Sequence, residues 1–333
     1  MALHTLDLAS AEEEERVRPA NVRSRADQSY RIFARAGGGL TLGLMALIGL
    51  FLVIRSWSAL RVAGFGFFTR SVWQPGQGAF GVWSALLGTF LIAIIALAIA
   101  VPVAVCSALY VTEYAPARIR RPLTSFIDVL AAIPSLIYGL WGRAFLQPRA
   151  ILLSRWLGTH LGFIPFFHTQ NAQSVASYPA STFIAGLVVA LMVVPICTAV
   201  MREVFSQAPP GEKEGALALG GTKWGVIRSV VLPFGRGGII GGSMLGLGRA
   251  LGETIAVTLL ISPNFDPHSL THVLQTGGNS IASLIALRWS ESTTFGISAL
   301  MAAGLTLFVV TLIVNAIASI IVARSRSGVA TEI

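Results

Sequence analysis

Six long apolar stretches recur along the chain, and polar stretches rich in arginine, glycine or proline separate them. A helix needs about 20 apolar residues to cross the roughly 30 Å hydrocarbon core of a membrane. The pattern therefore predicts an all-α membrane protein with six transmembrane helices. The expected helices cover residues 37–54, 83–111, 123–145, 181–201, 237–262 and 295–323.

Polar tails flank the predicted membrane domain, which covers residues 37–326. Residues 1–36 hold four consecutive glutamates and six arginines, and they contain too few apolar residues to build a core. We expect residues 1–36 to be a disordered cytoplasmic tail whose role stays open, and residues 327–333 to be a short cytoplasmic tail.

The distribution of Lys and Arg predicts the orientation of these helices. With both termini in the cytoplasm, the cytoplasmic segments hold 16 Lys and Arg, and the outer segments hold seven. Cytoplasmic loops of membrane proteins carry such an excess. The same orientation places the polar segment of residues 203–235 on the cytoplasmic side.

Composition agrees with a membrane protein, because 54% of the 333 residues are hydrophobic and 12% are charged. A soluble domain has about 25% charged residues. The net charge of +9 follows from the topology, and no basic stripe beside aromatic residues indicates a nucleic-acid partner. Cys106 and Cys197 lie in apolar runs, which is typical of core residues. His268 and His272 lie in a loop without a third ligand, so we expect no metal site.

The segment of residues 203–235 has a helix-favouring run of Ala and Leu that two glycines follow. Glycine readily adopts the left-handed conformation that ends a helix, so we expect a short helix that ends there. The residues that define the spacing of this segment are Glu214, Gly215, Ala216, Gly220, Leu232 and Pro233.

This spacing resembles the EAA loop of the permeases of ABC importers, which reads Glu-Ala-Ala, three residues, Gly, nine residues, Ile, one residue, Leu-Pro. Gly215 and Val230 are the two mild departures from that pattern. The resemblance implies a helix that docks on a separate ATP-hydrolysing subunit, and we call residues 203–235 the coupling segment. The alternative is an amphipathic loop on the membrane surface.

The fifth predicted helix combines glycines at four-residue spacing with two charged residues, Arg249 and Glu253. Small-residue stripes let membrane helices approach closely, so we expect this helix to be central. Arg249 lies about midway through the membrane, where an unpaired arginine costs at least about 2.5–3.5 kcal/mol. On a continuous helix, Glu253 lies one turn away on the same face and partly neutralises it. The pair predicts either a structural ion pair or the polar lining of an anion pathway.

Three stretches extend the resemblance to PstC-type permease subunits of bacterial phosphate ABC importers. They are AAIPSLIYGLWG at residues 131–142, LGRALGETIAVT at 247–258 and GGNSIASLIA at 277–286. The resemblance implies the type I importer permease fold in the cytoplasmic membrane and a role for Arg249 and Glu253 in phosphate translocation. It also implies a PstA-type permease as heterodimer partner, two PstB-type ATPase subunits and an external PstS-type phosphate-binding protein.

The same resemblance implies a subunit that is not an enzyme and binds no cofactor, since ATP and Mg²⁺ are handled by the partner subunits. The chain has no G-x-x-x-x-G-K-[ST] loop, which agrees with this expectation. Three other functions stay open at this point: a permease for sulfate, molybdate or another oxyanion, a membrane enzyme that acts on a lipid, and a stand-alone anion channel.

Overall fold

The computed structural model describes residues 25–169, 171–265 and 272–326. The chain forms two compact units, residues 1–51 and 52–333. Helix α1 (Arg25–Ala63) begins in the first unit and ends in the second. It includes the expected helix of residues 37–54 but starts earlier, at Arg25. Residues 25–36 contain no glycine or proline, the two residues that most disfavour a helix, so the helix can extend through them. The prediction of a disordered tail is therefore wrong for residues 25–36, and residues 1–24 and 327–333 lie outside the described residues.

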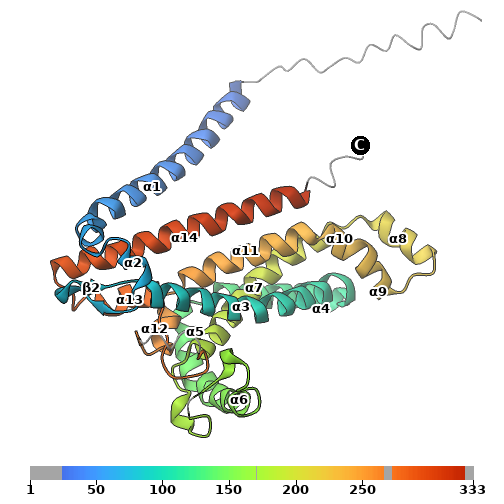
Figure 1. Cartoon of the computed structure of the whole chain (residues 1–333). Helices are drawn as coiled ribbons and strands as arrows, with labels where there is room; N and C mark the ends of the chain where they lie inside the picture. The colour runs from blue at the N-terminus through green and yellow to red at the C-terminus, as the bar shows by residue number, and fades with distance from the viewer. Residues whose placement is uncertain (1–24, 170, 266–271, 327–333) are drawn as a thin grey trace, which may run out of the picture. The chain divides into compact units, whose positions relative to one another are not determined.

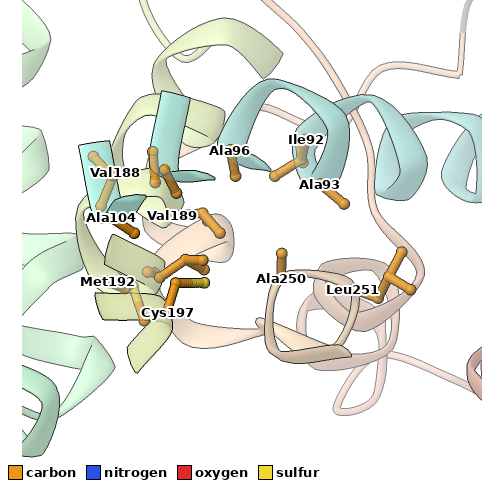
Figure 2. Close-up of a cluster of buried hydrophobic side chains, with 14 of the residues drawn as sticks. Ile92, Ala93, Ala96, Ala104, Val188, Val189, Met192, Cys197, Ala250 and Leu251 are labelled. Carbon is orange, nitrogen blue, oxygen red and sulfur yellow. The ribbon is translucent and has the colours of Figure 1, made fainter. Parts of the chain in front are cut away.

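The second unit is a bundle whose core lies between α3 (Trp83–Leu109), α7 (Thr182–Ser206) and α11 (Arg236–Gly252). Figure 2 shows side chains of these three helices gathered in one apolar cluster. α3 and α7 pack most extensively, because α3 places a fully buried alanine at every fourth position. The alanines are Ala96, Ala100, Ala104 and Ala108. Such small side chains let two helix backbones approach closely.

The glycine stripe of α11 packs as its spacing predicts. Gly238, Gly242 and Gly246 are buried. A Cβ at Gly238 would lie 2.6 Å from Val204, and a Cβ at Gly246 would lie 2.7 Å from the Sγ of Cys197. These glycines let α11 lie against α7 without steric conflict.

Within the part of the chain that the structure describes, four helical segments are long and apolar enough to cross a membrane: Gln28–Ala63, Trp83–Tyr114, Thr182–Ser206 and Thr294–Val322. Two bent pairs of helices bring the number to six if each pair is one span. The pairs are Ala117–Ala132 with Ser135–His160, bent by 90°, and Lys223–Phe234 with Arg236–Gly252, bent by 65°. The prediction of a six-helix membrane protein is confirmed in this form.

The third predicted helix is the first bent pair. α4 (Ala117–Ala132) ends at Ile133, whose extended backbone precedes Pro134, and α5 (Ser135–Trp141) follows. A residue before proline is disfavoured in the helical conformation, which accounts for the bend. A π-helical turn and α6 (Gln147–His160) continue the chain where a loop was expected, so that prediction was wrong.

The remaining elements lie at the two ends of the bundle. In Figure 1, α8 to α10 lie at one end of the second unit, and β2 and α13 lie at the opposite end. The latter end has its own apolar cluster, which includes Phe67, Phe80 and Leu300. β1 (Trp73–Gln74) and β2 (Ala79–Phe80) form an antiparallel hairpin there, paired as Trp73 with Phe80 and Gln74 with Ala79.

The short helices complete the described chain. They are α2 (Gly66–Thr69), α8 (Pro210–Ala218), α9 (Lys223–Val226), α10 (Leu232–Phe234), α12 (Ile255–Leu260) and α13 (Ile281–Arg288). The last helix is α14 (Thr294–Arg326). Three-residue 3-10 helices lie at Pro75–Gln77, Pro165–Phe167 and Val175–Ser177, and π-helical turns lie at Tyr110–Tyr114, Gly142–Leu146 and Ile227–Val231.

Candidate functional site

The coupling segment contains the short helix that its sequence predicts. α8 carries Glu214, Gly215 and Ala216, and none of its residues is buried. Gly220 follows it in a left-handed conformation with φ of 84°. The backbone N–H of Gly221 donates to the carbonyl of Ala216 at 3.0 Å, and the N–H of Gly220 donates to Leu217 at 2.9 Å. These two bonds form a Schellman motif, and the prediction that glycine ends this helix is confirmed.

The second part of the coupling segment turns back toward the bundle. The side chain of Thr222 caps α9 by accepting from the N–H of Gly225 at 3.1 Å. α10 then holds Leu232, which is half-buried, and Pro233, which is exposed. The bend to α11 falls at Gly235, where a Cβ would lie 2.2 Å from the Phe205 ring of α7. Only glycine fits this close approach.

Apolar side chains stand exposed on the coupling segment. Leu219 is 92% exposed, and Leu217 and Trp224 are about half exposed. A polar segment at the end of a membrane helix bundle gains nothing by exposing large apolar side chains to water. Exposed apolar groups on a polar surface mark a place where another protein or a membrane binds.

An ion pair fixes α8 to the membrane helices. The Nζ of Lys213 lies 2.7 Å from the Oε1 of Glu113, and both side chains are largely shielded from solvent. Glu113 belongs to the π-helical turn that follows α3. If α8 moved away from α3, each of the two shielded side chains would lose its partner and keep an uncompensated charge, which is costly. The ion pair therefore holds α8 against the end of α3. This contact could not be predicted from the sequence, because the two residues lie 100 positions apart.

The fifth predicted helix is broken at Glu253. α11 ends at Gly252, the backbone of Glu253 is extended with ψ of 120°, and α12 begins at Ile255. The Oε1 of Glu253 accepts from the N–H of Ala256 at 3.2 Å. The carboxylate therefore satisfies one of the free N–H groups of the first turn of α12.

The prediction that Arg249 and Glu253 form an i, i+4 pair on a continuous helix is wrong in this structure. Within residues 25–169, 171–265 and 272–326, ion pairs join Arg202 to Asp128, Lys213 to Glu113 and Arg288 to Glu291. Arg249 takes part in none of them. The cause is the helix break, since Glu253 turns its carboxylate to the N–H of Ala256.

The structure nevertheless brings Arg249 and Glu253 to one pocket of about 580 Å³. α11 supplies most of its lining, and Ile196 of α7 and Asn315 of α14 complete it. Glu253 is buried, whereas Leu245 beside the pocket is exposed. We call this the α11 pocket, and it places Arg249, Glu253 and Asn315 together on the face of an apolar bundle.

Arg249 has unused hydrogen-bonding capacity in this pocket. It is half-buried in the last turn of α11, where the helix dipole favours a cation. Its Nε is buried and has no hydrogen-bond partner among the described residues. A buried donor without an acceptor costs about 1–3 kcal/mol. A ligand that supplies an acceptor oxygen would remove this cost, so the site favours binding of such a ligand. A guanidinium can donate two parallel hydrogen bonds to an oxyanion.

Asn315 is the residue of this pocket that sequence reasoning missed. It lies beside Gly248 of α11, since a Cβ at Gly248 would lie at an ordinary contact distance of 3.5 Å from the Oδ1 of Asn315. A polar side chain in the middle of the apolar α14 was the available signal, since such residues face the bundle interior or a cavity.

Two other polar contacts lie outside this pocket. Asp128 of α4 pairs with Arg202 of α7 at 3.7 Å between Oδ1 and Nη2. His272 lies against His168 with ring centroids 5.3 Å apart, and His268 lies outside the described residues. Among the described residues, no group of three His, Cys, Asp or Glu side chains is arranged to hold a metal ion.

Comparison with known proteins places this geometry in a family. Residues 100–327 match the family model of the binding-protein-dependent transport system inner membrane component. The chain is 41% identical over 316 residues to the phosphate transport system permease protein PstC 2 of Mycobacterium tuberculosis, covering 94% of this chain and 95% of the relative. It is also 41% identical over 311 residues to the phosphate transport system permease protein PstC of Haemophilus influenzae, covering 92% and 94%.

A solved structure has a similar fold. It is a bacterial ABC transporter involved in the import of the acidic polysaccharide alginate, with a TM-score of 0.54 and 17% identity. The similarity covers 88% of this chain and 99% of that chain, and it supports the type I importer permease fold. The fold, the apolar helices and the match over most of the chain agree, and the protein belongs to the family of binding-protein-dependent transport system inner membrane components, as a multi-pass protein of the inner membrane.

Proposed function

We propose that this chain is the PstC-type permease subunit of an ATP-driven importer that carries inorganic phosphate across the cytoplasmic membrane. The names of its relatives support this cargo, since two proteins with 41% identity are phosphate transport system permease proteins. The observation that carries the chemistry is the half-buried Arg249, whose Nε lacks a partner beside the α11 pocket. Phosphate offers several acceptor oxygens and a negative charge to such a guanidinium.

In this proposal, the α11 pocket is half of the phosphate pathway. One side of the pocket is left open in the single chain, and the exposed Leu245 lies on its rim. A PstA-type permease closes that side as the heterodimer partner. Arg249 then offers its donors to phosphate in a site from which water is largely excluded. Glu253 acts on the shape of the pathway, because its carboxylate caps α12 and maintains the break in the helix.

The coupling segment transmits the work of ATP hydrolysis. Two PstB-type ATPase subunits bind the complex, and one of them receives α8 with the exposed Leu217 and Leu219. The Lys213–Glu113 ion pair passes the movement of α8 to α3, and Gly235 lets the bend between α10 and α11 pack against Phe205 of α7. An external PstS-type protein delivers phosphate to the opposite end of the bundle. This chain binds no ATP, Mg²⁺ or other cofactor itself.

The cytoplasmic position of both termini is part of the proposal. It is supported by the excess of Lys and Arg in the segments assigned to the cytoplasm, 16 against seven. It also places α8 on the side where ATP is available.

Uptake of labelled phosphate by cells whose own copy is deleted tests the cargo. Cells that regain this chain, together with its partner subunits, should regain phosphate uptake, and excess unlabelled sulfate or molybdate should not compete. Competition by sulfate or molybdate, or no uptake of phosphate at all, would refute phosphate as the cargo. Uptake without the ATPase subunits would indicate a channel instead of an importer.

A further inference from the structure

A groove between α3, α4 and α7 lies apart from the α11 pocket. It consists of two pockets, of about 640 Å³ and about 260 Å³, that share Val111 in their lining. Each of the three helices passes from the larger pocket to the smaller one within about one turn. α3 and its π-helical turn contribute Tyr110 and then Glu113, and α7 contributes Thr198 and then Arg202. The two pockets are therefore one groove with two chemically different ends.

The larger end is apolar. Side chains such as Val103, Leu123 and Leu191 line it, and Val103 and Leu191 are each at least 40% exposed. Its volume and its lining match those of pockets that bind hydrophobic ligands, which measure about 300–1,000 Å³. At the membrane face of a helix bundle, the apolar groups at hand to fill such a space are lipid chains.

The smaller end is polar and positively charged. Arg120, Arg202, Lys213 and Glu113 line it, so three cations face one carboxylate. Lys213 pairs with Glu113, and Arg202 pairs with Asp128, which lies outside the lining. Arg120 donates to backbone carbonyls, which leaves its charge uncompensated.

Arg202 has unused donors as well. Its Nη2 lies 3.7 Å from Asp128, which is a long contact, and its Nη1 is buried without a hydrogen-bond partner among the described residues. A guanidinium with one weak contact and one free donor has capacity for an anionic group. The polar end therefore favours an anion, and the adjoining apolar end favours a hydrocarbon chain.

We propose that this groove binds an anionic phospholipid, with an acyl chain in the larger pocket and the phosphate headgroup beside Arg202 and Arg120. The proposed orientation of the chain places the polar end at the cytoplasmic leaflet, since Lys213 belongs to α8. Basic residues near that surface attract anionic lipids by about 1 kcal/mol each. Because Lys213 also holds α8 against α3, the lipid would contact the coupling helix directly.

A lipid-exchange measurement tests this proposal on the full chain, purified with the subunits that accompany it. The complex is stripped of lipid and equilibrated with equal amounts of phosphatidylglycerol and phosphatidylcholine that carry the same acyl chains. The retained lipid is quantified by mass spectrometry. We expect phosphatidylglycerol to be enriched about thirtyfold, the ratio that two basic residues at about 1 kcal/mol each provide.

Two variants probe the two ends of the groove. R202Q should lower the enrichment to about fivefold, because Arg120 alone remains beside the headgroup. V103W should reduce the amount of retained lipid, because the indole fills the larger pocket. The matched controls are R121Q, an exposed arginine of α4 outside the pocket, and I94W, a membrane-facing residue of α3 outside it. Both controls should behave as the unchanged chain.

Three results would overturn the proposal. Equal retention of the two lipids by the unchanged complex would show that the headgroup is not recognised. Unaltered retention in V103W would show that no acyl chain of the retained lipid occupies the larger pocket. Displacement of the lipid by excess inorganic phosphate would show a free-anion site. None of these readouts depends on phosphate uptake, so they are separable from a failure of the proposed function.

Discussion

Apolar side chains are usually buried and charged ones exposed, and the coupling segment and the helix break at Glu253 depart from this rule in opposite ways. On the coupling segment, apolar side chains stand in the open, and Leu219 is 92% exposed. At the break, the side chain of Glu253 is buried between apolar helices, and Arg249 beside it has a donor without an acceptor. Each region is costly in the isolated chain, and each cost is relieved by a different binding event. In the proposed function, an apolar protein surface completes the first region, and an anion completes the second.

The two regions also differ in how tightly their glycines are packed. Gly246 of α11 lies against Cys197 and Val193, each 2.7 Å from the position of an added Cβ. Gly215 of α8 has no atom within 4 Å of that position. The same substitution, glycine to alanine, therefore has opposite signs in the two regions, and this contrast can be tested directly.

The largest expected effect is that of Gly246→Ala. The added methyl group meets two side chains that cannot move aside without shifting α7, so we expect a loss of about 1–3 kcal/mol in the free energy of unfolding. Thermal unfolding of the purified protein measures this loss. Gly241→Ala on the same helix is the control, because its added Cβ meets nothing within 4 Å. Equal stability of the two variants would mean that α11 does not pack on α7 as described.

Glu253 distinguishes a capping role from a charge-pairing role. Glu253→Ala removes the acceptor for the N–H of Ala256, and we expect it to cost about 1–2 kcal/mol of stability and to reduce uptake. Glu253→Gln keeps an acceptor oxygen and removes the charge, so this variant should keep most of the stability and most of the phosphate uptake. If Glu253→Gln is as impaired as Glu253→Ala, the charge of Glu253 matters and the capping account is wrong.

The exposed apolar side chains of the coupling segment give a smaller and more local effect. Leu219→Ser should weaken the binding of the ATPase subunit by about 1–2 kcal/mol, or roughly five- to thirty-fold, with no change in the stability of the chain. A titration of purified ATPase subunit against the permease measures this affinity. Phe65→Ser, which alters a side chain that is 93% exposed outside the coupling segment, should leave the affinity unchanged.

The smallest expected effect concerns the departure from the EAA pattern at Gly215. Gly215→Ala places a good helix former in the open interior of α8, so we expect a gain of up to about 1 kcal/mol. Gly220→Ala should instead lose about 1–2 kcal/mol, because the φ of 84° is unfavourable for a residue with a Cβ. Hydrogen exchange of the α8 amides should slow in the first variant and accelerate in the second. The reverse order would contradict the Schellman motif at Gly220.

Hydrophobic length and spacing predicted much of this fold from sequence. The spans of α3, α7 and α14 follow from their long apolar runs, because a chain in a membrane must form a helix to satisfy the hydrogen bonds of its backbone. The stripe of Gly238, Gly242 and Gly246 predicted close packing, which the contacts with α7 confirm. Gly220 was expected to end the helix of the coupling segment, and it does.

The breaks in helices were not predicted, because local contacts decide them. Pro134 was visible in the sequence, but a proline in a membrane helix produces anything from a slight kink to the 90° bend between α4 and α5. The break at Glu253 depends on a carboxylate that caps the next helix, and an i, i+4 reading of Arg249 and Glu253 assumes a continuous helix. Asn315 lies more than sixty positions from Arg249 in the sequence, so only the fold brings it to the same pocket.

The most direct test of the central claim compares Arg249→Gln with Arg236→Gln. Arg236 is an exposed arginine at the start of the same helix, so both variants lose one positive charge from α11. Labelled phosphate uptake is measured at equal membrane abundance, with the ATPase subunits still co-purifying. We expect Arg249→Gln to reduce phosphate uptake by more than about tenfold, since a hydrogen bond to a charged group is worth about 1.5–3 kcal/mol. Arg236→Gln should keep normal uptake. Normal uptake by Arg249→Gln would contradict the account and place the phosphate pathway away from the α11 pocket.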